Sequence, residues 1–291
     1  MKWLYECFGV SKQAFYKRLK TTRKQMKQED ELVRMVTEGR KYTGSQTGGL
    51  KLYCSLKAEM ERKGIKVGRD KFYTFLRSNQ LLVAKSKNYH ITTDSKHQFY
   101  KYPNLVQNKI PTRPEQLWVS DITYIKTEAG HNYLALVTDA YSKQIMGYHL
   151  GNHMKASLCT EALSMAIKNR KYPDKALIHH SDRGFQYCSA EYVKLAEDSG
   201  MTMSMTEQYD PYENAVAERV NRTLKYEFGL KMTIKDTALA KKMVEHGVHV
   251  YNTRRLHLSL NMLTPRQVHS SGQGDYKIYR RDKSVVEKLL H

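Results

Sequence analysis

Hydrophobic and polar positions follow two different periods along this chain, and the change between them falls near residue 114. Beyond that point, runs typical of strands are interspersed with runs at helical spacing. The predicted strands are 117–128, 133–141, 143–153, 176–182 and 201–206, and the predicted helices are 156–170, 189–200 and 215–228. The resulting order, βββαβαβα, predicts an α/β fold in which three antiparallel strands continue into a mixed sheet with helices on its faces.

The first 83 residues show helical spacing only. Ser11 is placed to cap a helix over 11–20. The polar segment 21–30 is expected either to connect units or to begin the next helix, over 31–42. Two further helices are predicted over 50–64 and 69–82, with a glycine-containing turn between them. Their inner faces are expected to hold Leu50, Tyr53, Leu56 and Met60 in the first and Phe72, Phe75 and Leu76 in the second.

Helix, turn and helix in this order is typical of a DNA-binding helix-turn-helix motif, whose second helix enters the major groove. Lys71 and Arg77 are expected on the outward face of that second helix, and they are candidate DNA contacts. The alternative is an ordinary helical hairpin with a solvated basic face. The domain organisation predicted overall is a basic helical DNA-binding region (1–83), an extended basic linker (84–113), a catalytic core (114–270) and a C-terminal tail (271–291).

Charge favours a nucleic-acid partner for the first part of the chain. The protein has 49 Lys and Arg against 29 Asp and Glu, a formal net charge of +20. Residues 1–110 contain 24 basic and 9 acidic side chains, whereas residues 111–291 contain 25 and 20. The excess thus lies before the α/β region, as expected for a DNA- or RNA-binding segment that precedes a nearly balanced domain. Charge alone also fits a ribosomal or membrane-surface protein.

Cysteine spacing and hydropathy indicate in which cellular compartment the protein is expected. The four cysteines, Cys7, Cys54, Cys159 and Cys188, form no CxxC pair and no zinc-type spacing, so free thiols in a reducing cytosol are expected. No run approaches the ~18 consecutive apolar residues of a membrane span, and the N-terminus has no secretory-signal pattern. We therefore expect a cytoplasmic protein with no membrane partner.

Three acidic residues are candidate metal ligands. Asp121 lies in the first predicted strand, Asp182 at the end of the fourth, and Glu218 in the last helix. Ligands of open α/β sheets gather at the carboxyl ends of strands, and Mg²⁺ prefers a few carboxylates together with substrate phosphates. Two such ions activate the attacking oxygen and stabilise the leaving oxygen of an in-line phosphoryl displacement.

Basic side chains share the helix of Glu218. Arg222 follows Glu218 by four residues and Lys225 by seven, so all three are expected on one helix face. Cations there would hold DNA phosphates beside the metal. The alternative, for a helix taken in isolation, is a surface helix with a Glu–Arg pair.

The flanking segments carry a family resemblance. WVSDITYI, HHSDRGFQY and ENAVAERVNRTLKYE, with 60 residues between Asp121 and Asp182 and 35 between Asp182 and Glu218, closely resemble the D,D(35)E core of retroviral-integrase-like insertion-sequence transposases. Segment 251–268 is similar to the C-terminal signature of that family. Its matching residues are Tyr251, Asn252, Arg255, His257, Leu260, Thr264 and Pro265.

The resemblance implies a ribonuclease-H-like core that uses Mg²⁺ or Mn²⁺, two ions in all, held by Asp121, Asp182 and Glu218. It implies a transposase that cleaves at insertion-sequence ends and transfers the freed 3′-hydroxyl to double-stranded target DNA, acting as an oligomer on DNA in the bacterial cytosol, associated with the nucleoid. Lys225 matches the family's basic contact to terminal DNA. The chain also resembles the downstream reading-frame product, which often acts as a fusion with an upstream product that recognises the element's terminal inverted repeats.

Some assignments have alternatives. Glu213 stands where the family commonly has Asp and is a rival third acid, although its spacing of 30 favours Glu218. His180 is expected on the same sheet face as Asp182, either beside the metal or as a structural histidine, and Asn214 is assigned with it around the site. Asp139 is expected to cap a turn. The rival functions are a non-catalytic DNA-binding relic of such an element and a simple metal nuclease without joining activity.

Overall fold

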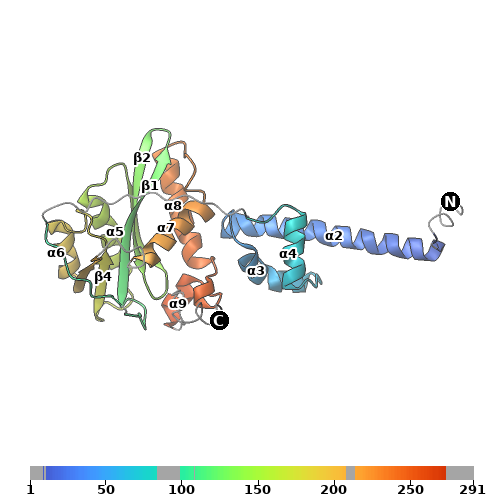
Figure 1. The fold of residues 1–291 in the computed structure, drawn as a ribbon, viewed down its shortest axis with the longest axis horizontal. Helices are drawn as coiled ribbons and strands as arrows, with labels where there is room; N and C mark the ends of the chain where they lie inside the picture. Colours follow the sequence, from blue (N-terminus) through green and yellow to red (C-terminus); the bar gives the residue numbers. More distant parts are fainter. Residues whose placement is uncertain (1–8, 10, 84–98, 108, 208–213, 273–291) are drawn as a thin grey trace, which may run out of the picture. The chain divides into compact units, whose positions relative to one another are not determined.

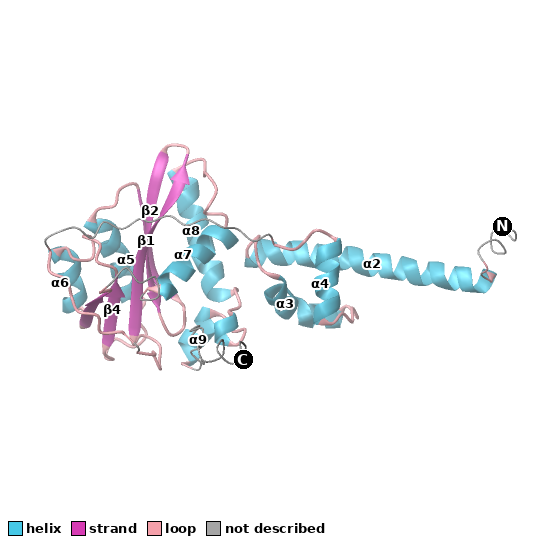
Figure 2. Cartoon of the chain, in the orientation of Figure 1, coloured by secondary structure: helices cyan, strands magenta, loops and turns pink. Residues whose placement is uncertain are grey.

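A computed structural model of the chain describes residues 9, 11–83, 99–107, 109–207 and 214–272. Most of the predicted linker, the rival acid Glu213 and most of the predicted tail lie outside the described residues. The chain forms two compact units, residues 1–86 and 87–291. Figure 2 shows that the first unit is built from helices, whereas the second combines helices with a sheet.

The first unit contains α2 (Lys12–Thr43), α3 (Gly49–Arg62) and α4 (Arg69–Ser78). Ser11 caps α2 as predicted, because its Oγ accepts a hydrogen bond from the Ala14 amide at 3.1 Å. Residues 21–30 are helical, so the alternative of a connection is wrong, and they do not begin a separate helix either, since α2 is one helix of 32 residues. No glycine or proline occurs between Ser11 and Gly39, so nothing in the backbone interrupts it.

The core of this unit lies between the three helices. On α4, the predicted inner residues Phe72, Phe75 and Leu76 are buried, and Lys71 and Arg77 are exposed as expected. On α3 the buried residues are Leu52, Leu56 and Met60, so the predicted stripe was partly wrong at its N-terminal end. The α4 helix ends at Ser78 rather than at 82, because Gln80 adopts a left-handed φ of 56°.

The second unit confirms the predicted order βββαβαβα. Its strands are β1 (Leu117–Thr127), β2 (Gly130–Asp139), β3 (Ile145–Gly151), β4 (Leu177–Ser181) and β5 (Met201–Met205). They form one mixed sheet in the order β3-β2-β1-β4-β5, in which β1, β2 and β3 are antiparallel and β4 and β5 run parallel to β1.

Helices cover both faces of this sheet (Figure 1). The helices α5 (Ala156–Lys168) and α6 (Ala190–Asp198) pack on one face, and α7 (Ala215–Glu227) and α8 (Thr237–Thr253) pack on the other. A 3₁₀ turn, η1 (Leu258–Leu260), and α9 (Pro265–Ser271) complete the described chain. The fold is therefore the predicted α/β core preceded by an all-helical region.

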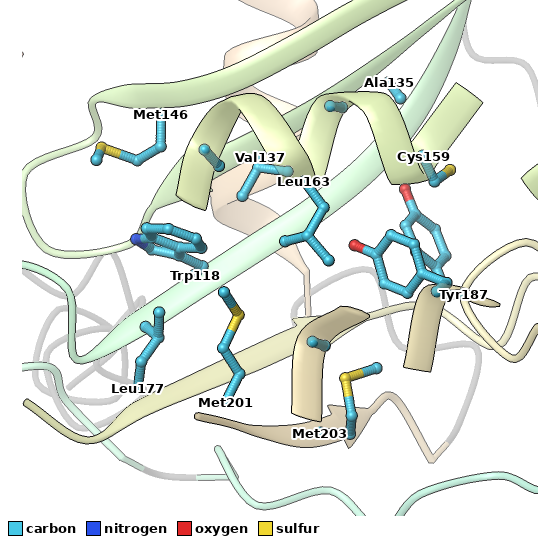
Figure 3. Packing of buried hydrophobic residues seen from close by; sticks show 14 of the residues in the cluster. Trp118, Ala135, Val137, Met146, Cys159, Leu163, Leu177, Tyr187, Met201 and Met203 are labelled. Atoms are coloured by element: carbon cyan, nitrogen blue, oxygen red, sulfur yellow. The ribbon is translucent and has the colours of Figure 1, made fainter. Parts of the chain in front are cut away.

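Two hydrophobic cores follow from this layering. Figure 3 shows the core under α5 and α6, where Trp118, Val137, Leu163 and Met201 pack together. Gly147 allows β3 to approach α5 here, because a Cβ at this position would lie 2.1 Å from the Ala162 carbonyl oxygen. The core under α7 and α8 is centred on residues such as Ile125, Leu136, Val220, Leu224 and Val244.

The described end of the predicted linker lies along the edge strand β5. The Met205 amide donates to the Pro103 carbonyl at 3.4 Å, and the Leu105 amide donates to Ser204 Oγ at 2.9 Å. The Tyr102 hydroxyl donates to Glu197 of α6 at 3.1 Å. Residues 102–105 are therefore packed on the second unit.

The predicted C-terminal signature fastens α8 and α9 to the rest of the core. The Asn252 side chain accepts from the Ile145 amide and donates to the Ile145 carbonyl, both at 2.9 Å. Arg255 makes two hydrogen bonds of 2.6 Å to the Glu227 carboxylate at the end of α7, and it donates to His257 Nε2 at 2.8 Å. Thr264 forms a capping box with Gln267 at the start of α9. His257, to which sequence analysis assigned no role, thus accepts a hydrogen bond from Arg255. We refer to Asn252, Arg255 and His257, with their partners Ile145 and Glu227, as the latch.

A buried network holds α9 against the sheet. Asp139 caps the turn after β2 as predicted, accepting from the Ser142 amide and hydroxyl at 2.7 and 2.6 Å. His269 of α9 lies 3.0 Å from Ser142 Oγ and 3.2 Å from a carboxylate oxygen of Glu115. Burial lowers the pKa of His269, but its hydrogen bonds and charge interactions with Asp139 and Glu115 outweigh this and raise it to about 9.

The His269 network predicts a pH-dependent stability. A histidine whose folded pKa of about 9 lies above its unfolded value of 6.5 stabilises fully below pH 6.5 and loses this effect as the pH rises through 9. His269→Gln should therefore lower the free energy of unfolding by roughly 2–3 kcal/mol at pH 6. The difference from wild type, measured by urea unfolding, should shrink towards pH 10. A difference that grows with pH would contradict the protonated state.

Candidate active site

Asp121 and Asp182 are brought together by the pairing of β1 with β4. The two strands are parallel, with Val119 opposite His180. Continuing this register by two residues places Asp182, which directly follows β4, opposite Asp121. Partners in adjacent strands point to the same face of a sheet, about 5 Å apart. Two acids separated by 60 residues in sequence are therefore neighbours at one position of the sheet.

The helix α7 lies over this position and is fixed there by its own residues. Ala217 packs with Val119 of β1, and Val220 and Leu224 enter the core beneath α7. Asn214, the predicted neighbour of the site, is buried and donates to the Ser120 carbonyl at 3.0 Å. This bond ties the start of α7 to the residue before Asp121.

Asn221 also reaches the site, and sequence analysis did not identify it. Its Nδ2 donates to Asp121 Oδ2 at 2.7 Å, and its side chain is buried. The other Asp121 oxygen, Oδ1, accepts from the Ile122 amide at 2.8 Å. The available sequence signal was position, because Asn221 follows Glu218 by three residues and so lies on nearly the same helix face.

The carboxylates carry an electrostatic penalty. Burial, followed by the charge of Asp182, raises the pKa of Asp121 to about 7, although the hydrogen bond from Asn221 favours its charged form. Asp182 Oδ1 accepts from the Gly184 amide at 3.0 Å. Two close carboxylates that repel each other in this way are typical of a site for a cation.

Glu218 occupies the first turn of α7 and is exposed. It lies near enough for its charge to raise the pKa of Asp121, but its effect is smaller than that of Asp182. Within the described part of the chain, no three His, Cys, Asp or Glu side chains converge closely enough to hold a metal ion. The structure therefore brings two of the three predicted acids together and places the third on the adjacent helix.

The predicted basic residues of α7 differ in their surroundings. Lys225 is half-buried, with its Nζ 4.0 Å from the centre of the Tyr124 ring, and burial lowers its pKa while Asp121 raises it. Arg222 is exposed, and its guanidinium lies 5.8 Å from the centre of the Tyr226 ring. Lys225 therefore lies beside the strand of Asp121, whereas Arg222 faces solvent.

His180 is buried next to the end of β4, and its Nδ1 lies 2.9 Å from Ser204 Oγ. Its neighbour His179 faces the opposite side of the sheet, where its Nε2 lies 2.8 Å from both Ser120 Oγ and the Tyr192 hydroxyl. Burial lowers the pKa of His179 to about 3, so this histidine is neutral. A role of His180 beside a metal stays a prediction.

A cavity of about 240 Å³ opens at the two aspartates. Tyr124, Tyr133 and Phe185 are among its walls. A larger hollow of about 500 Å³ lies between β3, α5 and α8, and Glu245 is the one acidic side chain among its described lining residues. The smaller cavity contains the acid pair, so it is the candidate site for phosphoryl chemistry.

Known proteins share this core. Two models described as "Integrase core domain" match residues 111–211 and 199–265. The uncharacterized 31 kDa protein of insertion element IS600 from Shigella sonnei is 33% identical over 262 residues, covering 89% of this chain and 95% of the relative. A putative transposase of insertion sequence IS986/IS6110 from Mycobacterium tuberculosis is 33% identical over 211 residues, covering 68% of this chain and 73% of the relative.

Among solved structures, the integrase catalytic core of HTLV-2 in complex with magnesium is 16% identical, covers 54% of this chain and 97% of that chain, and has a TM-score of 0.44. The sequence relatives define a DNA transposase, a polynucleotidyl transferase with an integrase core domain. This chain belongs to the insertion-sequence transposase family with an integrase core domain. Integrase-like cores of this kind use divalent metal ions.

The structure bears on two further predictions, those of free cysteines and of no membrane-spanning segment. Cys54, Cys159 and Cys188 are free, as expected, whereas Cys7 lies outside the described residues. None of the described helices combines the length and the apolar character that crossing a bilayer requires.

Proposed function

We propose that Asp121, Asp182 and Glu218 hold the divalent metal with which this transposase cleaves insertion-sequence ends and joins them to target DNA. The observation that carries the proposal is the parallel register of β1 with β4, which, continued by two residues, sets Asp182 opposite Asp121. This register sets two carboxylates side by side at a cavity whose described lining residues include no basic side chain.

The donor chemistry of these residues fits Mg²⁺ or Mn²⁺. Both ions accept carboxylate oxygens and leave coordination positions for water and phosphate. The raised pKa of Asp121 reflects burial and a nearby like charge, and a cation would remove the second cause. Two ions, when bound, supply an activated oxygen nucleophile and stabilise the leaving oxygen. The exposed carboxylate of Glu218 would complete the ligand set from α7.

The chain's own residues would orient the DNA during two in-line displacements. In the first, water attacks the phosphodiester at the element end, the P–O3′ bond breaks and the element keeps a free 3′-hydroxyl. In the second, that hydroxyl attacks a target phosphodiester, and the target's own 3′ oxygen leaves as a hydroxyl. Asn221 would hold the Asp121 carboxylate in one orientation. Lys225, beside Tyr124, and the exposed Arg222 would bind phosphates of the terminal DNA, while Lys71 and Arg77 on α4 would bind DNA through the first unit.

Glu218→Gln, compared with Glu213→Gln, tests which glutamate is the third acid. If Glu218 is a ligand, its amide variant should lose joining activity by about 10²-fold or more, because an amide oxygen carries no formal charge for the metal. Glu213→Gln should stay near wild type. The assay is joining of labelled DNA that carries the element's terminal inverted repeats, with Mn²⁺ or Mg²⁺, and Mn²⁺ affinity by calorimetry is a second measurement.

If joining activity is lost only in Glu213→Gln, Glu213 rather than Glu218 is the third metal ligand. Cleavage without joined product in the wild type would instead favour a simple nuclease. If the wild type gives no reaction, the same assay is repeated with the upstream reading-frame product fused to the chain. If the fusion also gives neither cleavage nor joining, a non-catalytic DNA-binding relic of such an element is the better account.

Four further assignments belong to the proposal. The active form is a homo-oligomer on DNA, and the upstream product, as a fusion, supplies recognition of the terminal repeats. The protein works in the bacterial cytosol, associated with the nucleoid. Residues 1–83 form the DNA-binding region, 84–113 the linker, 114–270 the catalytic core and 271–291 the tail.

A further inference from the structure

The N-terminal half of α2 buries no side chain within the described part of the first unit. Every buried residue of this helix, namely Leu32, Met35 and Val36, lies in its second half. Residues 12–30 contain no buried side chain. At about 1.5 Å per residue, this bare segment is roughly 28 Å long. Figure 1 shows it projecting past α3 and α4, and we refer to residues 12–28 as the arm.

The arm is strongly basic. No Asp or Glu occurs between Glu6 and Glu29, and the arm contains seven cations: Lys12, Lys17, Arg18, Lys20, Arg23, Lys24 and Lys27. At about 100° per residue, all of them except Arg18 fall within a sector of about 140°, less than half of the helix circumference. The exposed Tyr16 lies within the same sector. The arm therefore presents one continuous basic face.

The cations of this face are uncompensated. None of the seven takes part in a salt bridge with another described residue, since the salt bridges of this unit involve Glu31, Glu59 and Asp70. Like charges three or four residues apart, such as Lys20 with Lys24, destabilise a helix by about 0.2–0.5 kcal/mol per pair. A helix without tertiary packing is also marginal in water. A polyanion laid along the basic face would relieve the repulsion.

We propose that the basic face of the arm binds the phosphate backbone of double-stranded DNA. This inference rests on the proposed function, since the DNA is that of the transposition complex, but it assigns a binding surface separate from Lys71, Arg77 and the residues of the catalytic core. The 17 residues of the arm span roughly 25 Å, which matches about seven base pairs, so several phosphates lie within reach of the six aligned cations.

A second copy of the chain is the other occupant that the arm suggests. Phe15, Leu19 and Met26 form a narrow apolar stripe beside the basic face, with spacings of four and seven residues. The polar Thr22 and Glu29 fall on this stripe where a coiled-coil seam needs apolar residues. The basic face is broader and uninterrupted, so the charge distribution favours DNA.

The test compares two triple variants of the full chain with equal charge. Lys20, Lys24 and Lys27 are changed to Gln in the arm, and the control has Lys168, Lys194 and Lys241 changed to Gln at exposed positions of α5, α6 and α8. DNA binding is measured by fluorescence anisotropy in EDTA, without catalysis, over a range of salt concentrations. The arm variant should bind at least tenfold more weakly near 0.1 M salt, and its salt slope should fall by up to about 2.7, because each phosphate contact contributes ~0.9.

Hydrogen exchange provides an independent measurement. Amides of residues 12–28 should exchange rapidly in the free protein and become protected when wild type binds DNA. Equal binding curves for the two triple variants, or exchange in the arm that DNA leaves unchanged, would overturn the proposal. A change in oligomeric state by sedimentation with an unaltered salt slope would assign the arm to a second copy. DNA binding by the arm is measured without catalysis. A negative result there does not bear on the metal-site assignment, and a negative result in the Glu218 test does not bear on the arm.

Discussion

Asp182→Asn is expected to reduce both cleavage and joining of element-end DNA by about 10³-fold or more while leaving the fold intact. The substitution keeps the shape of the side chain but removes one of the two charges that face each other across β1 and β4. A loss of about 4 kcal/mol of transition-state stabilisation corresponds to this factor, and metal ligation is worth several kcal/mol in phosphoryl transfer.

The same variant carries a stability readout that separates chemistry from misfolding. Because Asp182 contributes to the raised pKa of Asp121, removing its charge should relieve repulsion and leave the melting temperature unchanged or higher in the absence of metal. The matched control is Asp174→Asn at an exposed loop position, which should keep full activity. Full activity in Asp182→Asn would remove this acid from the catalytic site, whereas a large drop in melting temperature would show that the residue is structural.

Arg255→Met is expected to destabilise the core by about 3–5 kcal/mol, the usual cost of breaking a buried ion pair from one side. Arg255 makes the paired 2.6 Å hydrogen bonds to Glu227, and the side chains of the two residues are only 7% and 17% exposed. Without the guanidinium, Glu227 is left charged and largely buried, and His257 loses a donor. Urea unfolding gives the free energy directly.

Two further variants test the geometry of this ion pair. Arg255→Lys keeps the charge but lacks the planar fork, so it should recover only part of the stability. Arg255→Met combined with Glu227→Met removes both charges and should recover most of it. Arg254→Met, next in sequence and exposed, serves as the control and should change stability by no more than about 0.5 kcal/mol. If Arg255→Met proves as mild as this control, the latch contributes little.

The latch also bears on function, because Glu227 terminates the helix that carries Glu218 and Lys225. If the C-terminal end of α7 is held less firmly, Glu218 and Lys225 should move relative to Asp121. The joining rate of Arg255→Lys, divided by the fraction of this variant that is folded, is therefore expected to be lower than that of the wild type. The C-terminal signature is thus explained as a packing device for α7 and β3.

The sequence was sufficient for most elements of the α/β core and for placing two acids as candidates for one site. Strand and helix periods are local properties, and they placed β1 to β5 and α5 to α7 within a few residues. The spacing around Asp121 and Asp182, together with the family resemblance, pointed to one site before any pairing was known. The polar run at 21–30 did not mark a boundary between two helices, because polarity does not end a helix in a stretch without glycine or proline.

The tertiary structure decided what depends on contacts between distant residues. The register of β1 with β4 sets Asp182 opposite Asp121, and only the packing of α7 brings Asn221 to the Asp121 carboxylate. Likewise, neither the Arg255–Glu227 pair nor the lack of buried residues in the first half of α2 follows from a local pattern. Periodicity reports which face of an element is apolar, because that is set within the element. The contacts of each polar side chain depend on the other elements of the fold. These contacts decide whether the side chain lies at the candidate site, holds another residue in place or stays exposed to solvent.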